Sequence, residues 1–425
     1  MGTDYAQILL DVQKKSNIAI TNIRDVKCLK EEIESFKDLK IGFNTLRRLF
    51  GFLQKTKPTL ATLNTLAGYL EFRSYASYLS NKLNFDTWYF QQKLLLIQQK
   101  KNLNKEDLTT LKQGLEQHQN IVYVAYFVAN LIQINKLGVL HDFFKRIDLK
   151  DRMDSDLLKF ATIVTHSFYG VDPSEVYAIY KGLMPYESFR IAVPFLYIDY
   201  SHLNGIYLEV LALVEENSKC TSDLLFVGLM RFYQQFYSLE SFGGHEIEFP
   251  EKFNKLSPVL KGRYFAYKIM ASNFVDNALK NAVFKECKKI KVHLFVEEVL
   301  PALMIKEEYE ILSALSEKYY EEIFESANWS SKTTNSMYLV ALATINWHKK
   351  AFKTAKINLE LVALAEVELS YYDYISLFYY LTKMKISHAE KETTVNAMAF
   401  FMVTQLVSKT GFVKFLAASE KYILK

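Results

Sequence analysis

The residues whose types and spacing point to a recognisable chemistry are basic and lie near the start of the chain. The segment from Lys40 to Leu70 contains no Asp or Glu. Its basic residues are Lys40, Arg47, Arg48, Lys55 and Lys57. These five charges equal the formal net charge of the whole protein, +5, so the other residues sum to about zero. Cations gathered on one short segment suit the phosphates of a nucleic acid.

The apolar spacing in this segment predicts a short amphipathic helix over residues 44–53. Its expected inner face consists of Leu46, Leu49, Phe50 and Leu53. Its outer face then carries Asn44, Thr45, Arg47, Arg48 and Gly51. Arg pairs with guanine through two hydrogen bonds, Asn pairs with adenine, and Thr contacts a base or a phosphate. Lys55 and Lys57 follow in a turn, where flexible ammonium groups suit phosphates. The segment is therefore a candidate DNA-contacting surface.

The neighbouring elements that must position this surface are also predicted to be helices. Two are expected before it, over Tyr5–Lys15 and Asn22–Phe36. After the turn, Thr59 is an expected N-cap. The buried face of the helix that it starts is expected to consist of Leu60, Leu63, Leu66, Ala67 and Leu70. Ser74 is expected to cap a last short helix, which holds Tyr75, Tyr78 and Leu79.

The order of these helices resembles the second half of phage-repressor and Cro-type (XRE-like) helix-turn-helix domains, over roughly Val26 to Leu79. In that family the helix matching 44–52 is the recognition helix, and the helix matching 59–70 belongs to the core. The resemblance implies DNA binding, with dimerisation for specific sites. Two features depart from the family: DVKCLKEEIESF lacks the usual Gln, and FKDLKIGF is longer than the usual tight turn. A divergent DNA reader and a helical module that lost DNA binding both fit these departures.

Composition predicts an all-α fold. The 425 residues include only 14 Gly and 7 Pro, the residues that most often mark turns. No series of segments with the alternating apolar and polar residues of strands is recognisable. We expect a small N-terminal helix-turn-helix-like domain over 1–82 and a connecting helix and linker over 83–107, with the linker at Gln98–Lys105. A helical body, with helices of about 12–20 residues, is expected over 108–425. Residues 238–258, which interrupt the helical pattern, form a possible seam.

Within the body, the segment Tyr338 to Val362 resembles a tetratricopeptide (TPR) unit. The resemblance places Ala343 and Ala355 at the close contact between two helices, with Lys349-Lys350 at the turn and Phe352 starting the second helix. Residues 121–147 form a weaker hairpin of this kind, turning at 135–138. A TPR-like α-solenoid and an irregular helical bundle both remain open for this body.

Other classes of function find no support in the sequence. Cys28, Cys220 and Cys287 form neither a CxxC pair nor a disulfide framework. No secretory leader, membrane-length apolar run or catalytic motif is recognisable. His245, Glu246 and Glu248 lack the spacing of metal ligands and are expected in a polar loop. We therefore expect a soluble, cytoplasmic protein that is not an enzyme, with no cofactor, no metal and no membrane partner.

Two functions follow as hypotheses. The first is a DNA-binding protein of transcription regulation that acts as a homodimer and whose helical-repeat body senses a peptide or protein partner in its groove. Its DNA-contacting residues are expected to be Asn44, Thr45, Arg47, Arg48, Lys40, Lys55 and Lys57. The alternative is a non-catalytic helical-repeat scaffold for protein–protein interaction that does not bind DNA. Ion pairs between Arg47 or Arg48 and acidic residues of the body would favour the scaffold.

Overall fold

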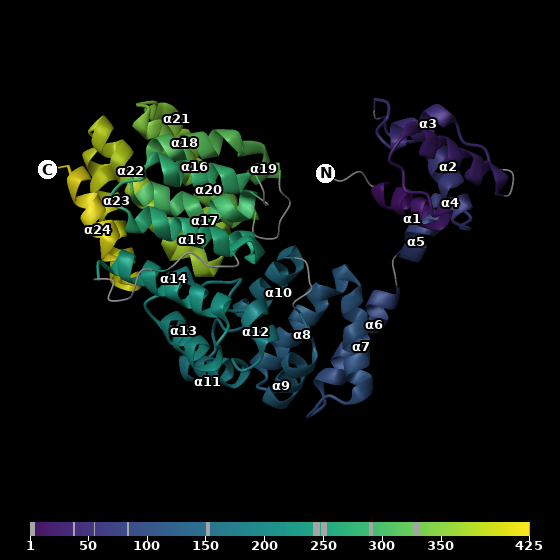
Figure 1. The fold of residues 1–425 in the computed structure, drawn as a ribbon, viewed down its shortest axis with the longest axis horizontal. Helices are drawn as coiled ribbons and strands as arrows, with labels where there is room; N and C mark the ends of the chain where they lie inside the picture. Colours follow the sequence, from purple (N-terminus) through teal and green to yellow (C-terminus); the bar gives the residue numbers. More distant parts are fainter. Residues whose placement is uncertain are drawn as a thin grey trace. The chain divides into compact units, whose positions relative to one another are not determined.

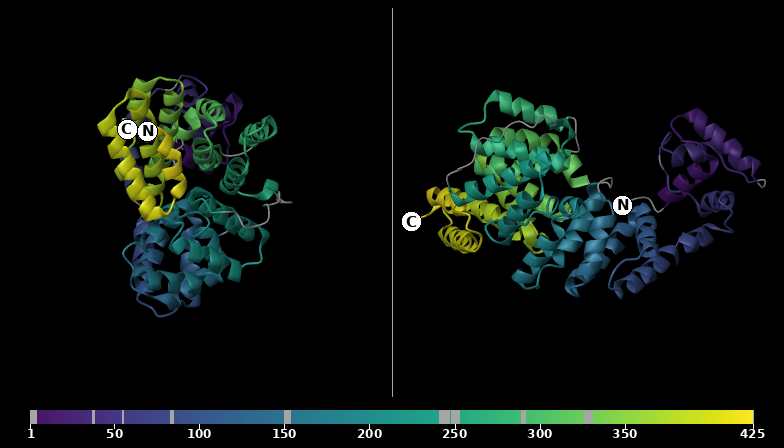
Figure 2. Two further views of the ribbon diagram at one scale, coloured as in Figure 1. Left: turned by 90° about the vertical axis from the view of Figure 1, so that its left-hand side faces the viewer. Right: turned by 60° about the horizontal axis from the view of Figure 1, so that its bottom comes forward.

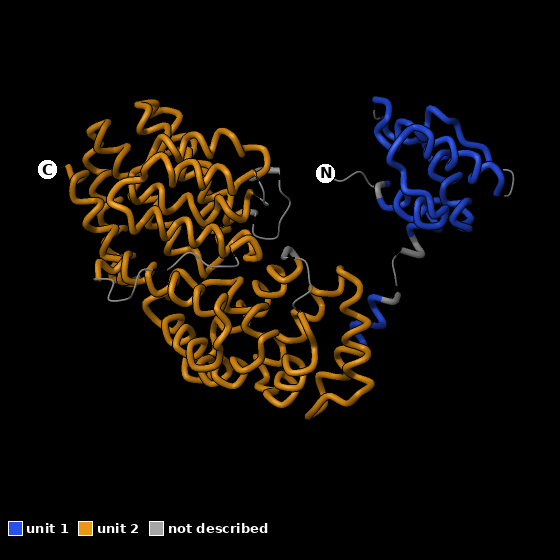
Figure 3. The backbone as a smooth tube through the Cα atoms, viewed as in Figure 1, with its two compact units in different colours: residues 1–92 blue, residues 93–425 orange. Residues whose placement is uncertain are grey.

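The fold is taken from a computed structural model of the chain. It describes residues 5–36, 39–54, 56–82, 85–149, 154–240, 247, 253–288, 292–325 and 331–424. Within these ranges the secondary structure is helical and contains no strand (Figures 1 and 2). The expected all-α class is therefore confirmed for the described part of the chain. The chain divides into two compact units, Met1–Gln92 and Lys93–Lys425 (Figure 3).

Unit 1 is built from short helices around one apolar core. Its helices are α1 (Ala6–Ser16), α2 (Ile23–Ser35), α3 (Phe43–Leu49), α4 (Leu60–Tyr69) and α5 (Tyr75–Lys82). α1 packs against α2 and α4, α2 packs against α3, and α4 packs against α5. Asn22 caps α2 through the backbone N–H groups of Arg24 and Asp25, as a side-chain oxygen at this position is able to do. Unit 1 carries thirteen Lys and Arg and nine Asp and Glu, and so holds +4 of the protein's net +5.

The helix expected over 44–53 is shorter than predicted. α3 ends at Leu49, because Gly51 adopts the left-handed conformation with φ +83°. The N–H of Gly51 donates to the carbonyl of Arg48 at 3.3 Å, and that of Phe52 donates to the carbonyl of Arg47 at 2.8 Å. These two bonds form a Schellman motif, which closes the helix. Gly51 therefore terminates α3 and is no part of a helical outer face.

The buried face of α4 also differs from the prediction at its start. Leu66 and Ala67 are buried as expected, but Leu60 is 65% exposed. Leu60 is the first residue of α4 and follows the capping residue Thr59, whose side chain accepts a hydrogen bond from the Thr62 N–H. A residue in this first turn lies beyond the core that α1 provides further along α4. The expected cap is confirmed, and the expected burial of Leu60 is wrong.

α6 (Phe85–Gln98) contains the division between the units, which falls inside the expected connecting segment 83–107. The polar cluster Gln98–Lys105 was expected to be a free linker, but part of it packs within unit 2. Leu103 is buried, and its N–H donates to Asp142 of α9 (Leu137–Arg146) at 2.9 Å.

Unit 2 contains the remaining helices. The α-helices are α7 (Lys105–Glu116), α8 (Ile121–Gln133), α9 (Leu137–Arg146), α10 (Asp154–His166), α11 (Pro173–Leu183), α12 (Glu187–Ala192), α13 (Ile206–Asn217), α14 (Thr221–Ser238), α15 (Pro258–Ala271), α16 (Asn277–Cys287), α17 (Val292–Ile305), α18 (Tyr309–Lys318), α19 (Tyr320–Glu325), α20 (Ser331–His348), α21 (Phe352–Glu360), α22 (Leu369–Glu390), α23 (Thr393–Thr410) and α24 (Val413–Ser419). Short 3-10 helices are η1 (His118–Asn120), η2 (Tyr200–His202), η3 (Phe253–Lys255), η4 (Leu364–Glu366) and η5 (Glu420–Tyr422).

Most helices of unit 2 pack against partners near them in the chain. α8 packs on α10, α13 on α14, α15 on α17, and α20 on α21 and α22. The last part of the chain instead returns to the middle, where α22 packs on η2 and α24 on α14. Tyr237 of α14 stacks on Phe415 of α24, with ring centroids 5.6 Å apart, and bonds the hydroxyl of Tyr374 at 2.8 Å. These aromatic contacts join α14 to α22 and α24, which lie far from it in the sequence.

The two hairpins singled out in the sequence are present as helix pairs. Ala343 of α20 and Ala355 of α21 are both fully buried, and α21 begins at Phe352. Lys350, at φ +60°, makes the turn between them. Asn135, at φ +53°, makes the corresponding turn between α8 and α9. Small residues at these positions allow two helices to approach closely, which is the role expected for Ala343 and Ala355.

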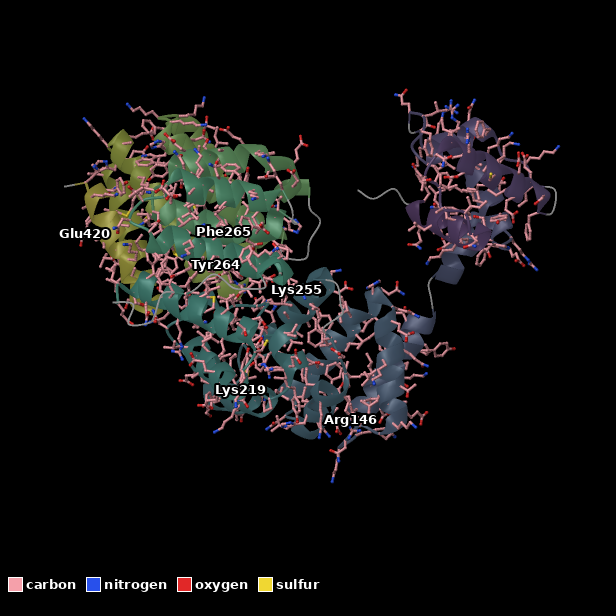
Figure 4. The ribbon with its side chains drawn as sticks, in the orientation of Figure 1. Arg146, Lys219, Lys255, Tyr264, Phe265 and Glu420 are labelled. Carbon is pink, nitrogen blue, oxygen red and sulfur yellow. The ribbon has the colours of Figure 1, made fainter. Side chains whose placement is uncertain are left out.

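α15 and α17 approach so closely that one position tolerates only glycine. A Cβ atom built on Gly262 would lie 2.7 Å from the carbonyl oxygen of Phe295 and 2.9 Å from Cβ of Glu298. The neighbouring residues Tyr264 and Phe265 on α15 are among those labelled in Figure 4. Phe265 packs edge-on against Phe295, with centroids 5.5 Å apart. The close approach brings Arg263 of α15 within 3.0 Å of Glu298 of α17.

The expected seam, 238–258, lies mostly outside the described residues. α14 ends at Ser238, Ile247 donates its N–H to the Tyr267 hydroxyl at 3.1 Å, and η3 precedes α15. Helix lengths in unit 2 also differ from the expected 12–20 residues, since α12 and α19 have 6 and α22 has 22. Among the helices described, none combines the length and the apolar character needed to cross a bilayer.

Candidate nucleic-acid interface and ligand pocket

α3 presents polar side chains on the side opposite its buried leucines. Leu46 and Leu49 lie in the core of unit 1, which fixes the rotation of the helix. Asn44 and Arg48, four residues apart, are both exposed and share one side of α3. Thr45 and Arg47 are half-buried at the edge of this side. The structure therefore brings these four predicted residues together on one short helix.

Arg47 is held in place by its neighbours on α3. Its Nη1 donates a hydrogen bond to Oδ1 of Asn44 at 3.3 Å, and its guanidinium lies over the Phe43 ring, 5.7 Å from the centroid. Its Nε is buried and has no hydrogen-bond partner among the described residues. A guanidinium has five N–H donors, so most of those on Arg47 remain available. The side chain is oriented without being neutralised.

Within unit 1, Arg47 and Arg48 have no acidic partner among the described residues. Neither forms an ion pair with a described residue of that unit. The described ion pairs of unit 1 join Lys15 to Glu71, Lys27 to Glu31 and Lys30 to Glu34. The cations of α1 and α2 are therefore partly compensated, whereas those of α3 have no described counter-ion within the unit.

Lys40 and Lys57 are exposed, but they differ in their surroundings. The pKa of the Glu34 carboxyl is lowered, first by its hydrogen bond from Lys30 and further by the positive charges of Lys30 and Lys40. Lys40 therefore shares its charge with Glu34. Lys57 has no such neighbour in the described part of unit 1. Lys55, the remaining predicted contact, lies outside the described residues.

The path from α2 to α3 is longer than in the family that the sequence resembles. Residues 36–42 separate Ser35, the last residue of α2, from Phe43, the first residue of α3. Ile41 in this connection is buried in the core, and Gly42 precedes α3 as its N-cap residue. α3 packs against α2 across this connection.

Unit 2 contains a pocket of about 400 Å³ between α10, α11 and α13. Aromatic and aliphatic side chains form most of its wall, including Phe168, Val176, Tyr180 and Tyr207. Asp199, His202 and the hydroxyl of Tyr169 supply polar groups. A largely apolar pocket of this size with a few convergent polar groups is the usual form of a ligand site.

The polar groups of this pocket are electrostatically coupled. Nδ1 of His202 lies 2.9 Å from Oδ2 of Asp199, and this hydrogen bond raises the pKa of His202. The hydroxyl of Tyr169 is buried and has no described partner, and burial raises its pKa, as does the charge of Asp199. The pocket wall thus contains a buried hydroxyl without a described partner near the carboxylate of Asp199.

None of His166, Tyr169, Asp199 and His202 was singled out as a site residue from the sequence. His166 lies 3.1 Å from Glu368, more than 200 residues away, and His202 lies beside Asp199. The spacing of Asp199 and His202, at i and i+3, was visible in the sequence. Their convergence with Tyr169 at one pocket joins segments about 30 residues apart, for which no sequence signal was present.

His245, Glu246 and Glu248 lie outside the described residues. Among the residues described, no three His, Cys, Asp or Glu side chains are placed to share a metal ion. No known family model matches the chain, and no match was found among curated proteins or solved structures.

Proposed function

We propose that this protein is a DNA-binding regulatory protein. In this proposal unit 1 contacts DNA through the polar side of α3, and unit 2 receives a peptide or protein partner. The observation that carries the proposal is the state of Arg47 and Arg48. Both belong to a helix whose apolar side is fixed in a core, and neither is ion-paired within the described part of unit 1. Uncompensated guanidiniums suit phosphates and guanine edges.

The distribution of charge supports the same interpretation. Unit 1 holds most of the net positive charge although it is the smaller unit. A few cations from one copy bind DNA weakly and with strong dependence on salt. Two copies bound to neighbouring half-sites would bind more tightly, so we include a homodimer in the proposal.

The proposed role of unit 2 rests on its pocket and on its helix hairpins. The hairpin α20–α21 has the small-residue contact of a TPR-like repeat, and a TPR-like body would offer a groove for an extended peptide. The pocket at Tyr169 and Asp199 would take one apolar residue of that partner and bond its backbone. A partner that binds only one arrangement of the dimer would change the fraction of dimers that are able to bind DNA.

The experiment compares the binding of a fluorescent random-sequence duplex by the full-length protein and by two charge-matched variants. Arg47→Ala with Arg48→Ala removes two cations from α3. Lys14→Ala with Arg73→Ala removes two exposed cations from other parts of unit 1. The proposal predicts that the first pair loses about tenfold or more of the affinity and that the second loses much less. Equal losses of affinity in the two variants would mean that binding depends only on the net charge of unit 1. Absence of binding by the unaltered protein would overturn the proposal.

A further inference from the structure

A second, more polar cavity lies deeper in unit 2, where segments far apart in the sequence meet. α10, residues 196–197, α15, α17, α20 and α22 all contribute to its wall. The space that the centres of water molecules can occupy in this cavity is about 50 Å³, enough for roughly four waters. A smaller cavity of about 20 Å³ has Glu297, Glu298 and Tyr371 in common with it. This space matches a small polar head group.

Two of the three carboxylates in this cavity already have partners. Glu298 accepts hydrogen bonds from Nε of Arg263 at 3.1 Å and from the hydroxyl of Tyr200 at 2.9 Å. Arg263 is only 2% exposed, and its Nη1 also donates to the carbonyl of Phe195 at 3.0 Å. The positive charge of Arg263 is therefore committed to Glu298 and to the backbone.

Glu368 is the second partnered carboxylate. It accepts a hydrogen bond from the Tyr197 hydroxyl at 3.2 Å and lies 3.1 Å from Nε2 of His166. Both neighbours orient its carboxylate at the wall of the cavity. Tyr197 and Tyr371 add aromatic rings to the same wall.

Glu297 is different, because it forms no ion pair with any residue that the structure describes. It lies half-buried on α17 beside the cavity. Burial, together with the neighbouring charge of Glu298, raises the pKa of Glu297 to about 7, although the hydroxyl of Thr334 and the positive charge of Arg263 favour the ionised form. A carboxyl group in this state gains stability from a cation that enters the cavity.

Two further acceptors lack a usual donor at this place. Pro301 lies inside α17 and has no N–H, so the carbonyl of Glu297, four residues earlier, loses its helical partner. The hydroxyl of Thr162, a residue that is 2% exposed, lines the cavity and has no hydrogen-bond partner in the described structure. A buried hydroxyl without a partner is costly, and a bound ligand would satisfy it.

We propose that this cavity binds an organic cation with several N–H donors, a guanidinium or a primary ammonium, and that the carboxylate of Glu297 is its counter-ion. The cation would donate to Glu297, to the freed carbonyl and to the Thr162 hydroxyl. Its face would lie against Tyr197 or Tyr371, whose rings attract cations. Arg263 and Glu298 would hold the wall of the site in place and make no net contribution to its charge. The inference goes beyond the proposed function and does not depend on DNA binding by unit 1.

The test uses calorimetric titration of the full-length protein with two probes of nearly the same shape. Butylguanidinium carries the charge, and butylurea replaces it with a neutral group of similar size. The proposal predicts binding of butylguanidinium at least tenfold tighter than that of butylurea. Glu297→Gln should abolish this preference, whereas Glu360→Gln, which removes an exposed carboxylate on α21, should preserve it. Thermal unfolding of both variants verifies that each is folded.

The source of the cation is distinguished by a second pair of probes. An acetylated and amidated Ala-Ala-Arg-Ala-Ala peptide is compared with the same peptide carrying neutral citrulline. Tighter binding of the Arg peptide than of butylguanidinium would identify a basic side chain of a polypeptide as the ligand, and weaker binding would identify a free small cation. Equal binding of butylguanidinium and butylurea, no binding of either, or unchanged preference in Glu297→Gln would overturn the proposed site.

Discussion

Arg47 donates a hydrogen bond from Nη1 to Oδ1 of Asn44, 3.3 Å away and three residues earlier on α3. The contact links Arg47 and Asn44, the two side chains of α3 that are best suited to hydrogen-bond with DNA bases. Asn44 orients the guanidinium from one side, and the ring of Phe43 supports it from another. An arrangement of this kind lowers the conformational entropy that Arg47 would lose on binding DNA.

This contact predicts that Asn44 affects DNA binding in two separable ways. Asn44→Ala removes the support of Arg47 and one amide contact, and should weaken DNA binding by about 1–2 kcal/mol. Asn44→Asp keeps the size of the side chain, but its charge would neutralise Arg47 and repel phosphate. It should therefore weaken binding more than Asn44→Ala, as measured by fluorescence anisotropy. An Asn44→Asp variant that binds as well as the unaltered protein would contradict this role.

Gly262 is expected to be indispensable for the packing of α15 on α17. In Gly262→Ala the new methyl group would meet the carbonyl oxygen of Phe295 at 2.7 Å, and a backbone atom cannot move aside at low cost. Overpacking of this kind destabilises by about 1–3 kcal/mol, which urea unfolding measures.

The matched control is Gly228→Ala in α14. There the nearest atom to the new Cβ is the side-chain Cδ1 of Ile247 at 3.7 Å, an ordinary contact. Ala is favoured over Gly inside a helix by about 0.5–1 kcal/mol, so this variant should be as stable as the unaltered protein or more so. Equal destabilisation by both substitutions would show that the close approach at Gly262 is unimportant.

Lys385 is expected to give unit 2 an unusual dependence on pH. Its ammonium is 3% exposed and lies over the rings of Tyr309, Trp347 and Tyr422 at 5.4, 5.2 and 5.5 Å. Burial lowers its pKa to about 8, although Glu307 lies 3.6 Å away and favours the charged form. Between pH 8 and 10.5 the unfolded chain therefore binds more protons at this position than the folded one. The free energy of unfolding should rise through this window, by up to about 3 kcal/mol from this group.

The measurement is urea unfolding at pH 7, 8, 9 and 10 for the unaltered protein and for Lys385→Met, which keeps the length and apolar stem of the side chain. The difference between the two proteins isolates the contribution of Lys385 from other titrations. It should shift in favour of the unaltered protein as the pH rises. Lys421→Met, which removes the 52% exposed cation beside the same Glu307, tests whether any nearby cation has this effect. Parallel curves for Lys385→Met and the unaltered protein would contradict the prediction.

Thr59 is expected to stabilise α4 through its cap. Its hydroxyl oxygen accepts the N–H of Thr62 at 3.2 Å, one of the donors that the start of a helix leaves free. Thr59→Ala should cost about 1 kcal/mol of local stability, visible as faster hydrogen exchange of the α4 amides in the intact protein. Thr59→Ser keeps the hydroxyl and should exchange nearly as slowly as the unaltered protein. If Thr59→Ser exchanged as fast as Thr59→Ala, the cap would not be the cause.

Helix class and several boundaries could be predicted because they depend on local spacing. The buried positions Leu46 and Leu49 follow from their helical period, and the cap Thr59 from a side chain able to accept a backbone N–H. The start of α21 at Phe352 follows from the small-residue pattern of a helix pair. In each of these cases the sequence pattern lies within a few residues of the structural feature that it predicts.

Helix ends were predicted less well, because the chain often turns without glycine. Residues at φ near +60° that are not glycine include Glu71, Asn135, Glu307, Lys350 and Lys391. Each follows a helix, and each costs more in this conformation than glycine would. A count of 14 Gly therefore underestimated how often helices end.

The interior of unit 2 could not be predicted, because its contacts join distant segments. Arg263 meets Glu298 across 35 residues, Tyr197 meets Glu368 across 171, and Tyr237 meets Tyr374 across 137. No local period indicates which buried acid will meet which base. The candidate interface on α3 was accessible to sequence reasoning for the opposite reason, since its residues lie on one short helix and in the segments next to it.

The salt dependence of DNA binding tests the central claim most directly. Affinity of the full-length protein for a random duplex is measured between 50 and 300 mM salt, beside Arg47→Ala with Arg48→Ala. Five cations that contact phosphates would give a slope of about −4 to −5 per copy in a plot of log affinity against log salt. The proposal predicts a steep slope that becomes shallower by about 1–2 in the double variant. Absent binding, or a slope unchanged by loss of Arg47 and Arg48, would contradict it.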